Sequence, residues 1–305
     1  MTRPARLAAA ALLIAGCAAG PAPVPGDGHP LLDLSTRLFF PDTRLGLQSQ
    51  QEILLGMKEL GASGGAGPGR SKEELADRLD DMGFSYALLG DHLLALAFVV
   101  QAAALVPDDA EVQVDVGVQL TALGHDEAAE EALVAALELD PGDPFTWRVS
   151  GDLRYVQGDY REAARLYAGS LDRVGDDDRD AFYGVIMLWL AQRRLEPAPG
   201  PFGPLADRDP RVWPGPVFEY LDGRLRAPAL VDAVLAPGGD EMRTRLCEAL
   251  FYVGERERAR GNSALALRYM REVLGTRVEL FRETVMARRI SRELLDAGVR
   301  PAVWP

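Results

Sequence analysis

One stretch of the chain has the residue spacing of a nucleotide-binding loop. Gly64, Gly69, Arg70 and Ser71 fit the P-loop pattern, except that arginine stands where the pattern has lysine. A P-loop also requires a preceding strand, so that backbone N–H groups and a helix N-terminus converge on the phosphates. Here the preceding segment, residues 47–60, has the periodicity of an amphipathic helix, with Ile53, Leu54, Met57 and Leu60 on one face. We therefore interpret residues 61–70, almost all Gly, Ala, Ser and Pro, as a connector and predict no nucleotide site.

The other residues that could act in catalysis or bind a metal are few and poorly placed for it. Asp91 with His92, and His125 with Asp126, are neighbours in sequence, and sequence neighbours do not face each other on a helix. Cys247 stands alone, and we interpret it as a small packing residue. The chain contains no nucleophile elbow, His-Glu-x-x-His or paired-cysteine pattern. We therefore predict a non-enzymatic protein without catalytic residues, cofactor or metal site.

A second cysteine, Cys17, lies at the end of a short apolar run near the N-terminus. Two arginines precede residues 7–15, which gives the charged and apolar regions of a secretory signal that is too short to span a bilayer. The sequence Ile-Ala-Gly-Cys at 14–17 resembles a bacterial lipobox. The resemblance implies that residues 1–16 are cleaved as a signal peptide and that acyl chains, palmitate among them, are attached to Cys17.

The residues after the lipidation site indicate where the protein lies. Ala18 follows Cys17, and the absence of aspartate at this position is typical of Gram-negative lipoproteins that are released to the outer membrane. The proline-rich residues 18–30 indicate a flexible tether, and we assign residues 17–46 to the lipidated cysteine and this tether. We expect a protein that is held by lipid at the outer membrane and faces the periplasm.

Composition argues against two classes of partner. The 305 residues are 48% hydrophobic and 7% aromatic, which suits helices in close contact. The formal net charge is −13. Such acidity argues against nucleic acid, whose phosphates need Lys and Arg, and against electrostatic adsorption to anionic lipid. The simplest interpretation of the charge is solubility.

A 34-residue period organises residues 76–177. Pro107 and Pro141 are separated by this step. Three classes of small residue also recur with it, namely Gly83, Gly117 and Gly151; Gly90, Gly124 and Gly158; and Ala95, Ala129 and Ala163. A period of 34 residues is that of the tetratricopeptide repeat, a helix–turn–helix unit that stacks into a solenoid.

Each of the three classes of small residue is required in such a unit for a physical reason that depends on its position. The middle glycines fall at the turn, where glycine takes positive φ at little cost. The other two classes fall where the paired helices meet, and a larger side chain there would push them apart. We therefore predict an all-α fold, a tetratricopeptide-repeat (TPR) solenoid with repeats at 76–109, 110–143 and 144–177. Ser71 and Glu74 form a capping box that extends this domain to 71–177.

The TPR pattern also predicts a protein-binding concave surface on the first helix of each repeat. In this chain the residues at those positions are apolar with acidic points: Asp77, Asp80, Phe84, Leu88, Glu111, Val114, Val118, Phe145, Arg148, Asp152 and Tyr155. The surface lacks the Lys/Asn cluster with which some TPR domains bind a C-terminal carboxylate. We expect an apolar or mildly basic peptide, or a protein surface, as the ligand. The alternative is that several of these side chains pack against flanking helices.

Residues 178–246 do not follow the period. Helices are predicted at 180–195, 213–225 and 227–236, and they resemble degenerate TPR units. Between the first two lies residues 196–216, a loop with seven prolines. The solenoid is therefore interrupted by degenerate helical repeats.

The period returns in the C-terminal part, 247–305. Gly254, Gly261 and Ala266 reproduce the offsets of the first repeat and predict a fourth one at 247–280. Its predicted binding residues are Glu248, Phe251, Glu255 and Arg258. A last helix at about 276–297, opened by a capping box from Thr276 and Glu279, would close the solenoid.

The order of these parts resembles that of the NlpI-type outer-membrane lipoproteins. The likeness covers about residues 47–295, including the predicted helix and connector at 47–70. It is most specific in Trp-Pro…Phe-Glu-Tyr-Leu at 213–221 and Phe-Tyr-Val-Gly…Gly-Asn-Ser-Ala-Leu-Ala-Leu-Arg-Tyr at 251–269. The resemblance implies a periplasm-facing homodimer. It would scaffold peptidoglycan endopeptidases and present them to a tail-specific protease, which regulates cell-wall hydrolysis.

Two functions are compatible with these features. The first is the adaptor for cell-wall hydrolases and their protease that the resemblance implies. The alternative is a TPR accessory lipoprotein for outer-membrane or pilus assembly, which would use the same solenoid. The two functions predict different co-purifying proteins.

Lipidation can be tested by replacing the acceptor. We expect Cys17→Ser to release the protein from the membrane fraction of a Gram-negative host into the soluble fraction, because the anchor is lost. The measurement is immunoblotting of separated fractions, with Cys247→Ser as the control that leaves the anchor in place. A Cys17→Ser protein that stays with the membranes would count against lipidation at this residue.

Overall fold

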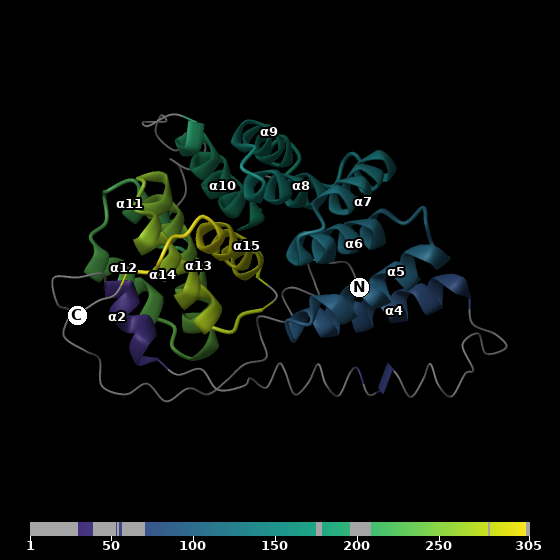
Figure 1. Cartoon of the computed structure of the whole chain (residues 1–305), viewed down its shortest axis with the longest axis horizontal. Coiled ribbons are helices and arrows are strands. Elements are labelled where there is room, and N and C mark those ends of the chain that lie inside the picture. Colours follow the sequence, from purple (N-terminus) through teal and green to yellow (C-terminus); the bar gives the residue numbers. More distant parts are fainter. Residues whose placement is uncertain are drawn as a thin grey trace. The chain divides into compact units, whose positions relative to one another are not determined.

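The computed structural model describes residues 30–38, 53, 55–56, 71–174, 179–195, 209–279 and 281–302. All regular structure within these ranges is helical, without a strand. The chain divides into two compact units (Figure 1): the repeat unit, residues 44–176, and the C-terminal unit, residues 1–43 together with 177–305. No helix in the described ranges is both long and apolar enough to cross a lipid bilayer.

The repeat unit consists of three helix pairs with the predicted period. The first helix of each pair is called helix A and the second helix B. The pairs are α4 (Lys72–Leu88) with α5 (His92–Leu105), α6 (Ala110–Leu123) with α7 (Asp126–Leu139), and α8 (Pro144–Val156) with α9 (Tyr160–Leu171), as Figure 1 shows. Successive B helices begin 34 residues apart. The predicted TPR solenoid fold is therefore confirmed for these residues.

Side-chain caps and left-handed glycines fix the ends of these helices. The Ser71 hydroxyl accepts a hydrogen bond from the Glu74 backbone N–H at 3.2 Å, at the position of the predicted capping box. Asp109 and Asp143, one period apart, cap α6 and α8 in the same way. The turns between the paired helices contain Gly90, Gly124 and Gly158, whose φ angles are 78°, 87° and 82°.

A large side chain of helix B lies directly over a glycine of helix A in each pair. A Cβ added to the glycine would be only 2.5–2.7 Å from a side-chain carbon of the facing residue. Only glycine permits this approach, which we call the glycine contact. The facing residues are themselves one period apart, so the pairs are Gly83–Val99, Gly117–Leu133 and Gly151–Tyr167.

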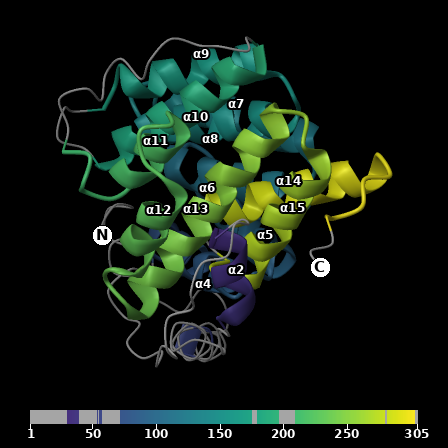
Figure 2. The same cartoon turned by 90° about the vertical axis from the view of Figure 1, so that its left-hand side faces the viewer.

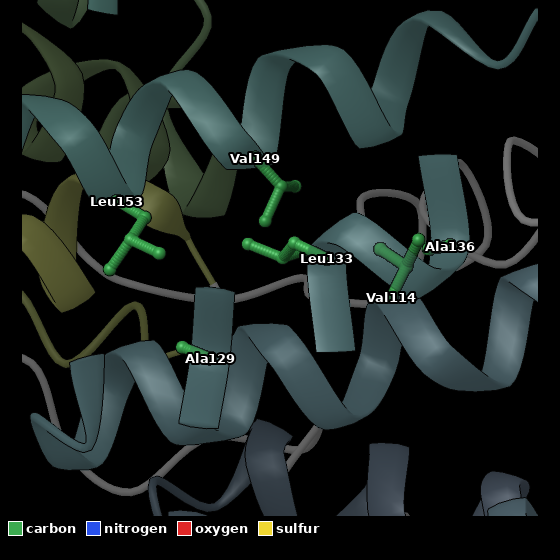
Figure 3. Packing of buried hydrophobic residues seen from close by; sticks show 6 residues of the cluster. All are labelled: Val114, Ala129, Leu133, Ala136, Val149 and Leu153. Carbon is green, nitrogen blue, oxygen red and sulfur yellow. The ribbon is translucent and has the colours of Figure 1, made fainter. Parts of the chain in front are cut away.

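The core continues from each repeat into the next. Val114 on α6 and Leu133 on α7 share one cluster with Val149 and Leu153 on α8. In Figure 3 the Leu133 side chain points towards Val149, across the boundary between the second and third repeats. Neighbouring repeats thus bury a common apolar surface, which is how a solenoid gains stability.

The C-terminal unit is arranged around one long helix. Helix α13 (Gly239–Ala259) contacts every other helix of this unit described by the structure. These are α2 (Pro30–Arg37), α10 (Arg179–Leu195), α11 (Gly215–Leu221), α12 (Ala227–Leu235), α14 (Ser263–Gly275) and α15 (Arg282–Asp296). The glycine contact recurs between Gly254 of α13 and Met270 of α14, at 2.7 Å. Gly261 has a φ of 83°, so α13 and α14 have the geometry of the predicted fourth repeat.

Helix α2 lies inside the segment predicted to be a tether. It packs against α12, α13 and α14, as Figure 2 shows, and buries Leu31, Leu32 and Leu34. The prediction of a tether is therefore wrong for residues 30–37. The helix is only eight residues long, too short for its apolar spacing to stand out from the surrounding prolines.

Three predicted boundaries also differ from the structure. Helix α13 begins at Gly239 rather than at 247, and α11 ends at Leu221 rather than at 225. The capping box of Thr276 and Glu279 is wrong, because α15 begins at Arg282. The Thr276 hydroxyl instead donates to the Val273 carbonyl at the end of α14, a local hydrogen bond that competes with capping.

Several predictions fall outside the described residues. They concern the signal peptide, Cys17, most of the helix predicted at 47–60, the connector at 61–70, and residues 196–208 of the proline-rich loop. These stay predictions.

The glycine contact can be tested with one added methyl group. We expect Gly117→Ala to lower the free energy of unfolding by about 1–3 kcal/mol, because its Cβ would overlap Leu133. This loss would occur although alanine has the higher helix propensity, by about 1 kcal/mol. The measurement is denaturant unfolding followed by circular dichroism.

The matched control is Gly275→Ala at the end of α14. The nearest atom to its added Cβ is a side-chain oxygen of Glu272 at 4.0 Å, so no loss is expected. Equal effects of the two substitutions would show that the contact at Gly117 does not constrain the pair.

Candidate functional site

The structure separates the predicted concave residues of the repeat unit into exposed and buried groups. Helix α6 contacts both α4 and α8, so the A helices that carry these residues are adjacent. Asp77 and Glu111 are exposed. Phe84, Leu88, Val118, Phe145 and Arg148 are half-buried. These seven residues form what we call the helix-A surface.

The other four predicted residues of the repeat unit are buried, as the packing alternative predicts. Asp80, Val114, Asp152 and Tyr155 are each less than 7% exposed. Asp152 accepts a hydrogen bond from the Tyr167 hydroxyl at 2.8 Å, within its own repeat. The Tyr155 ring packs edge-on against Tyr160, with ring centroids 5.2 Å apart. These positions therefore serve the core of the solenoid.

The helix-A surface combines apolar area with charge of both signs. Phe84, Leu88, Val118 and Phe145 supply partly accessible apolar groups on three successive A helices. The Arg148 guanidinium lies 4.8 Å from the centre of the Phe145 ring, which holds this cation against the aromatic face. Asp77 and Glu111 supply exposed carboxylates. Such a surface can bind an extended or helical peptide through apolar contacts with a polar border.

The four residues predicted to bind in the fourth repeat are correctly placed on a helix A but are not available to a partner. Glu248, Phe251, Glu255 and Arg258 are 5% exposed or less. Arg258 forms ion pairs with Glu255 at 3.2 Å and with Glu293 of α15 at 2.7 Å. The physical reason is that other helices of the C-terminal unit cover α13. The prediction that these four residues belong to the binding surface is therefore wrong.

Glu248 instead belongs to a buried cluster of polar side chains, which we call the glutamate cluster. The indole N–H of Trp213 donates to Glu248 Oε2 at 2.6 Å, and the Tyr183 hydroxyl donates to both carboxylate oxygens at 3.0 and 3.1 Å. Glu248 thereby links α13 to α10 and to the residues before α11. A buried carboxylate needs such donors, since it has lost its contact with water.

A second glutamate completes the cluster from α15. Glu283 accepts a hydrogen bond from the Tyr252 hydroxyl at 2.5 Å and pairs with Arg282 Nε at 3.1 Å. Arg282 also donates to the Tyr252 hydroxyl, at 3.0 Å, and to the Tyr183 carbonyl. The cluster therefore fastens α10, α13 and α15 together by charge-assisted hydrogen bonds.

Burial and the neighbouring charge change the ionisation of Glu248. Loss of solvent, followed by the negative charge of Glu283, raises the pKa of Glu248 to about 8. Cys247 lies beside it, and burial, followed by the charge of Glu283, raises the pKa of this thiol to about 12. The arrangement can hold a proton on Glu248 near neutral pH, and Cys247 packs as an interior residue.

The histidines and acidic residues considered in the sequence have structural contacts. Asp91 caps α5 by accepting from the Leu94 backbone N–H at 3.1 Å. His92 Nδ1 lies 2.9 Å from the side-chain oxygen of Gln119, and His125 stands at the start of α7. Among the residues described, no group of three or more His, Cys, Asp or Glu is arranged to hold a metal ion.

The glutamate cluster is not evident in the sequence, because the TPR offsets assign Glu248 to the concave surface. One signal could have revealed the burial. Residues 246–253 contain Glu248 as their one charged residue among seven apolar ones. A helix that is apolar on all sides is buried on all sides.

No protein-family model matches the chain. One solved structure similar to it is the Sgt2 TPR domain from Aspergillus fumigatus, with 22% sequence identity and a TM-score of 0.38. The match covers 41% of this chain and 85% of that domain. At this similarity it supports no conclusion about function, and the fold assignment depends on the helix pairs described above.

The raised pKa of Glu248 predicts how stability changes with pH. The folded-state pKa, about 8, lies above the ordinary value of 4.5, so the folded state binds the proton more tightly. The contribution of the Glu248 proton to the free energy of unfolding is complete below pH 4.5 and is lost as the pH rises through 8. We expect Glu248→Gln to remove this loss, which is at most about 5 kcal/mol at 1.36 kcal/mol per pKa unit.

The measurement is chemical unfolding of both proteins between pH 5 and 9, with Glu241→Gln as the control. Glu241 is exposed on the first turn of the same helix, so its replacement should leave the pH dependence unchanged. Parallel pH profiles for the wild type and Glu248→Gln would contradict a proton held on Glu248.

Proposed function

We propose that this protein is a lipid-anchored periplasmic adaptor that binds other proteins through the helix-A surface of its repeat unit. The observation that supports binding is the row of partly accessible apolar residues on α4, α6 and α8, bordered by exposed Asp77 and Glu111. Val118 and Phe145 also pack against the buried cluster of the second and third repeats, so these side chains offer a partner only their partly accessible area.

The anchor and the location follow from the N-terminal sequence. Arginines, an apolar run and a lipobox-like sequence precede Cys17. Acylation of Cys17 would hold the protein at the outer membrane, where the charge of the chain gives no attraction to anionic lipid. Lipid attachment would raise the local concentration of the adaptor near other envelope proteins.

The partners that we propose are peptidoglycan endopeptidases and a tail-specific protease. This choice rests on the resemblance to the NlpI-type lipoproteins, as does a homodimeric state. The role assigned to the protein is to bring hydrolase and protease together and so regulate cell-wall hydrolysis. We propose no chemical step for the chain itself, so its effect on cell-wall hydrolysis would depend entirely on binding.

Recovery of partners from cell envelopes tests this proposal. We expect the tagged full-length protein to recover an endopeptidase and a tail-specific protease, identified by mass spectrometry. The double variant Asp77→Lys/Glu111→Lys should recover about tenfold less, because both exposed carboxylates border the helix-A surface. Deletion of the gene should change endopeptidase levels.

The control for charge reversal is Asp296→Lys, an exposed residue at the end of α15, which should not affect recovery. The adaptor role would be rejected if neither enzyme were recovered and endopeptidase levels stayed unchanged after deletion. Recovery of outer-membrane or pilus assembly proteins in their place would favour the alternative function.

A further inference from the structure

Helix α5 exposes an apolar stripe to solvent. The helix contains no Asp, Glu, Lys or Arg. Four exposed residues of α5 follow one another at intervals of four, three and four positions, which places them on one side of the helix. They are Leu93, Ala97, Val100 and Ala104. Leu93 is 66% exposed and Val100 is 48% exposed. Leu94, also exposed, widens the stripe at its N-terminal end. We call these five residues the α5 stripe.

The repeat fold does not require this stripe. The residues one period later on α7 are Glu127, Glu131, Val134 and Glu138. Those two periods later, on α9 and its C-terminal cap, are Arg161, Arg165, Ala168 and Asp172. Each of these sets carries three charges, as expected for a helix face in water, whereas α5 carries none. An apolar face at a position where the sister repeats are charged marks an interaction surface.

The α5 stripe is bordered by negative charge. Residues 79–147 contain 14 Asp and Glu and no Lys or Arg. Helix α7, which shares a buried cluster with α5 through Val99 and Ala132, exposes Glu127, Glu131 and Glu138. Exposed Asp91 precedes the stripe, and exposed Asp108 follows it. A ligand of this face must therefore supply both apolar area and positive charge.

We propose that the α5 stripe binds an amphipathic helix of a partner protein, with apolar residues on one face and Lys or Arg along its edges. Eleven residues separate Leu93 from Ala104, which corresponds to about 16 Å or three helical turns. The small Ala97 and Ala104 alternate with Leu93 and Val100 and leave room for large apolar side chains of the partner. A partner helix with apolar anchor residues at positions i, i+3 or i+4, and i+7 would match the length of the α5 stripe.

The charge at the border argues against other occupants. A second copy of the chain would bring the same acidic residues to the interface, and like charges repel. Residues 47–60, the predicted amphipathic helix outside most of the described ranges, carry two Glu and one Lys and lack basic edges. Anionic membranes would be repelled as well. The α5 stripe lies on a helix B, apart from the helix-A surface, so the inference does not depend on the proposed function.

A pair of synthetic peptides tests the chemistry of the partner. The first is a helix-forming peptide of about 18 residues with leucines along one face and lysines at its edges, and the second replaces every lysine with glutamate. Fluorescence anisotropy with the full-length chain carrying Cys17→Ser measures both Kd values. We expect the lysine peptide to bind at least about tenfold more tightly, and its binding to weaken as salt is raised.

Variants on and off the stripe test the location. Val100→Lys should weaken binding of the lysine peptide by about tenfold or more, since it places a like charge in the apolar face. Glu127→Lys/Glu131→Lys should weaken it and reduce its dependence on salt. The control is Leu295→Lys on α15, which replaces a leucine of similar exposure, 52%, and should have no effect. Because Val100 and Leu295 are exposed, thermal unfolding should be unchanged in these two variants, whereas Glu127→Lys places a cation in the first turn of α7 and should lower the unfolding temperature slightly.

Four results would overturn the proposal. They are equal binding of the two peptides, absence of any effect of Val100→Lys, a dimer in sedimentation velocity that Val100→Lys dissociates, and binding to anionic vesicles that the same substitution abolishes. The third result would assign the stripe to a second copy of the chain, and the fourth to a lipid surface.

Discussion

The close approach of helix A to helix B at one glycine governs this structure. In four pairs a side chain of helix B fills the space that a Cβ would occupy on helix A. The facing residue varies from Val99 through Leu133 and Tyr167 to Met270, so the constraint lies on the glycine. Because this contact fixes the geometry of each pair, the remaining side chains are free to differ between repeats. Repeats of one shape can therefore carry different surfaces.

The C-terminal unit shows how far that freedom extends. Helix α13 keeps the glycine contact with α14, yet its other sides are covered by α2, α10, α11, α12 and α15. Glu248 would face a partner in an open solenoid, but here it accepts hydrogen bonds from Trp213 and Tyr183. Burial of Glu248 itself, followed by the negative charge of Glu283, raises the pKa of Glu248 to about 8, which favours a proton on this side chain near neutral pH. Glu248 thus occupies a position that the TPR pattern assigns to binding, but in this structure it belongs to a buried, ionisable cluster.

The repeat unit has its potential binding residues on two different sets of helices. The helix-A surface extends over α4, α6 and α8 and mixes apolar groups with Arg148 and acidic residues. The α5 stripe is confined to one B helix and carries no charge, with the exposed amide of Gln101 beside it and acidic neighbours around it. The helix-A surface also takes part in packing, because Val118 and Phe145 contact the buried cluster of the second and third repeats.

The sequence by itself determined the repeat: its period, the turn glycines, the small residues at helix contacts and the cap at Ser71. Each of these depends on a few neighbouring residues, or on one pair at a fixed separation, and so leaves a mark in the sequence. The tertiary structure alone decided which A-helix positions are exposed, because burial of Asp152 or Glu248 depends on side chains far along the chain. It also decided that α2, about 200 residues before its partners, packs against α12–α14. Packing between segments so far apart in the chain leaves no periodic signal in the sequence. It occurs only once, and it depends on the shape of the surface that α12, α13 and α14 leave uncovered.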